Sequence, residues 1–211
     1  MVNLTLLLFG LTLLYVSAIG RLEGYIKALF IQGLLLSLLM CFNFTGLKHW
    51  NFALIIVETI GFKTLVIPWF LQKVIHENEM VRETEPYITH FYSLLLTSLI
   101  FSFGFFVAYW AVKNAVDVRP LPFGIAISTI ITGLFIILTR KKLITHTMGF
   151  MIMENGIFLL SLAKLQEMPM IVNLGILLDI FLAVLLLGIF INKIKDTFEE
   201  LDIDRLKYLK D

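Results

Sequence analysis

Four ionisable residues stand inside long apolar stretches of this sequence of 211 residues: Glu58, Lys63, Glu154 and Asp179. A charged side chain at the centre of a transmembrane helix costs roughly 2.5 to 3.5 kcal/mol, so such residues usually face a bundle interior or water. Intramembrane carboxylates and lysines are typical of proton and ion pathways. These four residues are therefore the first candidates for ion translocation.

Glu154 is the strongest of these candidates. It stands near the middle of an apolar stretch, beside the polar residue Asn155 and between Gly149 and Gly156, which allow close helix approach. Burial disfavours the charged form of a carboxyl group and a nearby cation favours it. A carboxyl group that faces Lys or water can therefore take and release a proton, and we expect this role for Glu154. The alternative is a structural ion pair, or a protonated carboxyl group hydrogen-bonded to backbone.

The other three charges need partners on other helices. Asp179 is surrounded by Leu, Ile and Phe, and an interhelical hydrogen bond explains it as well as a transport role does. Glu58 and Lys63 lie five residues apart, about 140° around a regular helix, so they would face different neighbours. Gly61 and Pro68 permit a local π-bulge, which could bring the two together, or a simple proline kink.

His146 precedes Glu154 by eight residues, which places it about 12 Å along a helix and about 80° around it. The side chain could join a hydrated face through water, and histidine is a common proton shuttle in proteins. A polar interfacial histidine close to Lys142 explains the residue equally well.

Composition indicates the elements that must position these residues. Apolar residues make up 59% of the chain and charged residues 16%, far from the usage of soluble domains. We predict an all-α integral membrane protein, a bundle of about seven transmembrane helices. Nothing in the composition indicates nucleic-acid binding. The expected spans are 2–20, 25–44, 51–73, 91–112, 120–139, 143–164 and 171–192.

Most Lys and Arg residues, including the run Arg140, Lys141 and Lys142, fall on one side of a seven-helix arrangement. The positive-inside rule then places the N-terminus outside and the C-terminus in the cytoplasm.

Redox cofactors are not expected in this chain. Cys41 is the single cysteine, so the sequence has no iron–sulfur spacing and no intrachain disulfide. Paired histidines for haem are not indicated either, because His49, His76 and His90 fall in or beside predicted loops. Any electron transfer must then take place in partner proteins.

Several sequence blocks resemble a known family. The run 133–142, which ends in Thr-Arg-Lys-Lys, followed by a helix with Glu154 and Asn155, is similar to the small three-helix subunit of respiratory complex I and Mrp antiporters. That resemblance implies proton-path roles for Glu154 and Asp179. It also divides the chain into a four-helix segment, 1–119, a three-helix module, 120–192, and a cytoplasmic tail, 193–211.

A longer resemblance covers nearly the whole chain and points to component E of hydrogenase-4. It rests on four blocks in order: 62–68, 153–156, 179–184 and 201–204. The resemblance implies a subunit of a group 4 hydrogenase or complex I-like assembly in the cytoplasmic membrane of a prokaryote. The expected partners are antiporter-like and other membrane subunits and a NiFe-hydrogenase or similar peripheral arm. A stand-alone ion transporter or channel and a structural membrane anchor are the alternatives.

Overall fold

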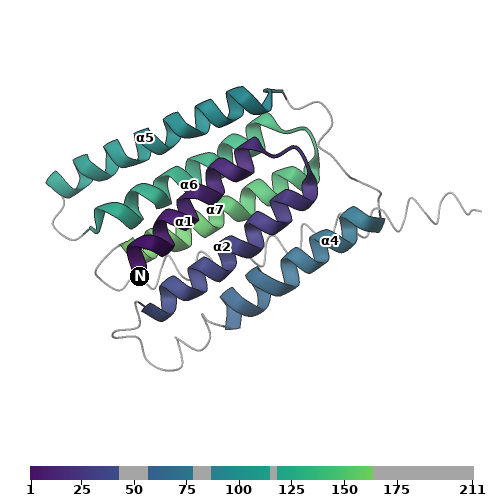
Figure 1. Cartoon of the computed structure of the whole chain (residues 1–211), viewed down its shortest axis with the longest axis horizontal. Helices are drawn as coiled ribbons and strands as arrows, with labels where there is room; N and C mark the ends of the chain where they lie inside the picture. Colours follow the sequence, from purple (N-terminus) through teal and green to yellow (C-terminus); the bar gives the residue numbers. More distant parts are fainter. Residues whose placement is uncertain (43–56, 78–86, 115–117, 164–211) are drawn as a thin grey trace, which may run out of the picture. The chain divides into compact units, whose positions relative to one another are not determined.

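The computed structural model describes residues 1–42, 57–77, 87–114 and 118–163, apart from the side chains of residues 57, 58, 62 and 77. All of these residues belong to one unit of the chain, Met1–Gly175. Every regular element in the described part is helical (Figure 1). The elements in chain order are α1 (Val2–Ala18), α2 (Leu22–Phe42), the π-helix η1 (Val57–Val66), α4 (Ile67–Glu77), α5 (His90–Asn114), α6 (Pro120–Thr139) and α7 (Leu143–Ala163).

Helices α2, α5, α6 and α7 are long and apolar enough to cross a membrane, and α1 is a shorter apolar helix. Together they confirm an all-helical, multi-pass membrane protein. Each of the first six predicted spans overlaps an observed helix, with η1 and α4 together in the place of the third. The seventh span, 171–192, and the tail, 193–211, lie outside the described residues. The number of about seven spans, the orientation and the division at residue 119 stay predictions.

Helix α5 shows how the chain distributes small and large side chains. Its buried residues are small or weakly polar, namely Ser93, Thr97, Gly104 and Ala108. Large apolar and aromatic residues such as Phe103, Phe106 and Trp110 are exposed. Small residues at helix contacts let backbones approach closely in membranes, where lipid solvates large apolar side chains. The Thr97 hydroxyl lies 2.6 Å from that of Ser17 on α1, which ties the two helices together.

Glycines set the contact between α6 and α7, which pack side by side (Figure 1). A Cβ atom added to Gly133 would lie 2.6 Å from the Gly149 carbonyl oxygen, and one added to Gly149 would lie 2.9 Å from the Gly133 carbonyl oxygen. Further along, a Cβ atom on Gly156 would lie 2.8 Å from the Ile130 backbone nitrogen. The close approach expected at Gly149 and Gly156 is therefore confirmed, and it fixes the helix that carries Glu154.

We expect Gly133→Ala to destabilise this helix pair, because the new methyl group meets backbone atoms that cannot move without separating α6 from α7. Overpacking of this kind costs about 1 to 3 kcal/mol. Thermal unfolding of the purified chain in detergent, followed by circular dichroism, should show a lower midpoint. Gly61→Ala is the matched control, since a Cβ atom there meets nothing within 4 Å. Equal midpoints for both variants would contradict the packing account.

The segment around Lys63 is a π-helix of 10 residues, which continues directly into α4. Of the two local distortions that Gly61 and Pro68 permit, the structure thus has the π-helical one. The Thr64 hydroxyl donates a hydrogen bond of 2.8 Å to the carbonyl of Thr59, five residues earlier, and so satisfies a backbone group of this unusual helix. π-Helical turns occur frequently at functional sites.

Candidate functional site: a buried ion pair and its polar neighbours

Lys63 and Glu154 form an ion pair inside the bundle. The Lys63 Nζ lies 2.9 Å from the Glu154 Oε1, and the two side chains are only 4% and 2% exposed. Glu154 is the twelfth of 21 residues in α7, about 16 Å from the start of the helix and so near its middle. The structure therefore joins two of the sequence candidates, one from η1 and one from near the middle of α7.

Two features place Lys63 beside Glu154: a contact of its ammonium with an aromatic ring, and the close packing of η1 against α2. Its ammonium lies 5.6 Å from the centre of the Phe158 ring, which is one turn beyond Glu154 on α7. Gly33 of α2 lets η1 come close, since a Cβ atom there would lie 3.2 Å from the Thr64 Cα. A cation over an aromatic face is stabilised by about 0.5 to 2 kcal/mol, more when it is desolvated.

A chain of hydrogen bonds begins at Asn155, the residue after Glu154, and crosses the bundle. Asn155 donates from Nδ2 to the Gln32 Oε1 at 3.0 Å, and Gln32 donates from Nε2 to the Thr12 Oγ1 at 2.8 Å. Thr12 in turn donates to the carbonyl of Phe9 at 2.6 Å. We call Thr12, Gln32, Lys63, Glu154 and Asn155 the buried polar cluster. It links α1, α2, η1 and α7, and all five side chains are buried.

Replacing Gln32 by Leu should destabilise the chain, because Asn155 and Thr12 lose a partner inside an apolar core. A buried polar group left without its hydrogen bond costs about 1 to 3 kcal/mol. The double variant Gln32→Leu/Asn155→Leu should recover part of this loss, since both amides are then gone. Unfolding midpoints in detergent check both expectations, and a single variant as stable as wild type would show that the amide bridge does not hold α2 to α7.

The remaining sequence candidates either do not contact this pair or lie outside the residues that the structure describes. His146, half-buried near the start of α7, places its Nε2 2.6 Å from the carbonyl oxygen of Arg140. This contact favours a structural role at the turn between α6 and α7. Glu58 lies in η1, but its side chain is outside the described residues, as is the whole of Asp179.

The basic run at the α6–α7 turn divides into two kinds of residue. Arg140 is 1% exposed, whereas Lys141 is exposed and its ammonium lies 5.1 Å from the ring centre of Tyr87. The Tyr87 N–H also donates to the Thr139 carbonyl at 3.1 Å, which ties the segment before α5 to this turn. A count of positive charges treats the three residues alike, but only part of the run is available to face a membrane surface.

Sequence reasoning missed Gln32, Thr12 and Phe158. For Gln32 a signal exists, because it is the single polar side chain between Ala28 and Leu36. Thr12 and Phe158 are ordinary in apolar helices, and nothing local distinguishes them. Within the described helices, no group of three or more His, Cys, Asp or Glu residues could hold a metal ion. The expectation of a chain without cofactors stays a prediction.

The fold and the site thus define a class: helical membrane proteins with a buried lysine–glutamate pair. Over 96% of its length the chain is 28% identical to an uncharacterized protein of Mycobacterium tuberculosis, of which the match covers 93%. It is also 26% identical to hydrogenase-4 component E of Escherichia coli K12 and of Shigella flexneri, over 56% of this chain. The chain spans about half, 54%, of those hydrogenase-4 components. No protein-family model and no solved structure matches.

Proposed function

We propose that this chain is a membrane subunit of a group 4 hydrogenase or complex I-like assembly, in which the Lys63–Glu154 pair takes part in moving protons or Na⁺. Similarity to hydrogenase-4 component E supports the membership in such a complex. The observation that carries the transport role is the ion pair itself, because 2.9 Å separates two charges buried near the middle of a helix bundle.

Stability alone is a weak reason for such a pair. The cost of removing two charges from water can exceed their attraction, and apolar residues of similar volume often stabilise a core as well. A pair at this depth is therefore explained better by ion translocation than by structure. Its chemistry is simple: at 2.9 Å a proton can pass from Nζ to Oε1 and leave a neutral amine and a neutral carboxyl group.

Transport needs the pair to exchange its ion with other groups. When another donor protonates Glu154, the carboxyl group loses its charge and releases Lys63. Glu58 and Asp179 are the proposed further carboxylates of this path, on the basis of the sequence. The π-helical backbone around Lys63 suits this role, because such segments have irregular hydrogen bonding and are frequent at functional sites. Electrons would move in partner subunits, which implies conformational or electrostatic coupling between the two processes.

Purification of the chain from its native membrane with a tag tests the assembly. We expect antiporter-like subunits and a hydrogenase or similar peripheral arm to copurify in fixed proportion. Purification as a single polypeptide, with ion flux when reconstituted alone, would instead identify a stand-alone transporter. Purification alone without ion flux would favour a structural membrane anchor.

A further inference from the structure

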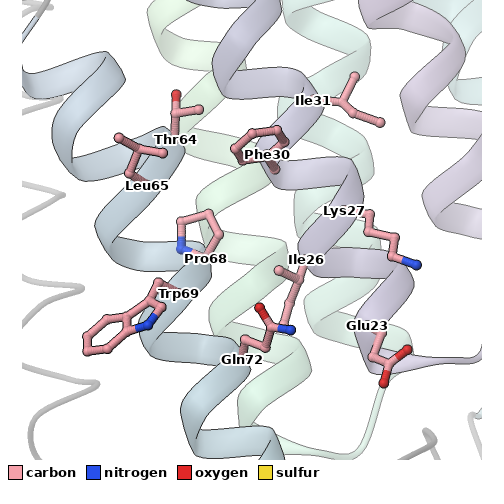
Figure 2. A pocket seen from close by; sticks show the side chains of 10 residues that line it. All are labelled: Glu23, Ile26, Lys27, Phe30, Ile31, Thr64, Leu65, Pro68, Trp69 and Gln72. Carbon is pink, nitrogen blue, oxygen red and sulfur yellow. The ribbon is translucent and has the colours of Figure 1, made fainter.

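A groove of about 620 Å³ lies between α2 on one side and η1 with α4 on the other, outside the buried polar cluster (Figure 2). Its volume falls in the range of small-molecule sites, about 300 to 1,000 Å³. Phe30 and Ile26 of α2 face Leu65, Pro68 and Trp69 across it. The walls are thus mainly apolar and aromatic.

Polar groups of the groove gather toward one end. Figure 2 shows Glu23 and Gln72 at the same end, with Lys27 one turn further along α2. That end lies at the start of α2 and the middle of α4, on the side that the positive-inside rule assigns to the cytoplasm. At the opposite end the Thr64 hydroxyl hydrogen is already donated to the Thr59 carbonyl, so Thr64 has no donor left for a ligand.

We propose that this groove binds one phospholipid molecule, with an acyl chain along the apolar walls and the phosphate near Lys27 and Gln72. The Lys27 side chain is exposed, and its long stem can carry the ammonium outward to a headgroup. Gln72 is exposed as well and can donate its amide N–H to a phosphate oxygen. The Glu23 carboxylate at the same end has its own partner, because the Arg21 Nη2 lies 4.0 Å from its Oε2, so the mouth carries two cations and one carboxylate. The site thus has a charged mouth and an apolar interior, which is the pattern of an amphiphile.

The length of the groove favours a lipid over a transmembrane helix of a partner. From Glu23 to Ile31 it follows eight residues of α2, about 12 Å along the axis. One leaflet of the hydrocarbon core is about 15 Å deep, so an acyl chain of a single leaflet fits this length. A partner helix would need a contact surface across the whole core of about 30 Å.

Trp69 provides the test, because it lines the groove and is 64% exposed, while Trp110 on α5 is outside the groove and 63% exposed. Two single-tryptophan variants of the full chain are compared in maltoside detergent, with Trp50 and one of these residues replaced by Phe. The probe is phosphatidylglycerol with brominated acyl chains, which quenches nearby tryptophan. The control probe is a diacylglycerol with the same chains and no phosphate.

We expect half-quenching of Trp69 at a concentration of brominated phospholipid about fivefold lower than that needed for Trp110. One lysine–phosphate contact strengthens binding by about this factor. Lys27→Gln should remove this difference and Lys27→Arg should keep it, while brominated diacylglycerol should quench both tryptophans alike. Native mass spectrometry of the unmodified chain should show one retained phospholipid that Lys27→Gln loses.

Four results would overturn the proposal. Equal quenching of Trp69 and Trp110 by the phospholipid would indicate ordinary bulk lipid. A preference that survives Lys27→Gln, or that the diacylglycerol shares, would exclude recognition of the phosphate. Protection of Trp69 but not Trp110 from the quencher in the purified complex would show that a partner subunit covers the groove. None of these results bears on the Lys63–Glu154 pair, which lies apart from the groove.

Discussion

Lys63→Met should destabilise the chain by about 3 to 5 kcal/mol, because it leaves the buried Glu154 carboxylate without its partner. Met is close to Lys in length and fills the same space, so the loss reports the charge rather than a cavity. The double variant Lys63→Met/Glu154→Leu removes both charges and should recover most of the stability, since apolar replacement of a buried pair is often neutral.

A double-mutant cycle in detergent, with unfolding of Lys63→Met, Glu154→Leu and the double variant, measures this coupling directly. Lys113→Met is the matched control, because Lys113 is an exposed lysine in the last turn of α5, outside both the pair and the groove, and should lose little stability. Additive effects of the two single substitutions at the pair would show that Lys63 and Glu154 do not interact in the folded chain.

Glu154→Gln should reduce ion movement by the assembled complex at least about tenfold, which corresponds to a barrier higher by roughly 1.4 kcal/mol. Gln has the same shape and can still accept a hydrogen bond from Lys63, but it cannot take up a proton. The complex should therefore assemble while its ion transport falls. Glu154→Asp keeps a carboxylate on a shorter side chain and should retain part of the activity.

Membrane vesicles that contain the intact complex are the sample for this measurement, with electron transfer and ion uptake followed together. Glu23→Gln is the control, because its side chain is 56% exposed and lies in the first turn of α2. The helix α2 meets η1 at Gly33, ten residues or about 15 Å further along its axis. Wild-type ion uptake by a fully assembled Glu154→Gln complex would mean that the pair is structural.

The sequence revealed the charges of the site because an ionisable residue in an apolar run is itself the signal. Glu154 and Lys63 both stand out for that reason. Their mutual contact could not be read from the chain, since it depends on which helices are neighbours. That neighbourhood rests in part on the close approach of η1 to α2 at Gly33, where a side chain would collide with Thr64. Glycine is common in apolar helices, so the sequence does not tell which glycine meets which partner.

The helices themselves were largely predictable, and their details were not. Long apolar runs predict α2, α5, α6 and α7 directly. In a bilayer, which offers no hydrogen-bond partners, a chain segment satisfies its backbone N–H and C=O groups by forming a helix. The π-helix at Val57–Val66 remained one of two alternatives, since Gly61 and Pro68 allow a bulge as well as a kink. The burial of Arg140 was missed because counting charges along the chain does not distinguish a buried basic residue from an exposed one.

Infrared difference spectroscopy of the complex during turnover tests the central claim most directly, since it detects changes in the protonation of carboxyl groups. If Glu154 carries a proton, the wild-type spectrum should contain a carboxyl signal that appears with electron transfer and is lost in Glu154→Gln. The same signal should persist in Glu23→Gln. A turnover spectrum unchanged by Glu154→Gln, in a complex that moves protons, would contradict the assignment of Glu154 to the proton path.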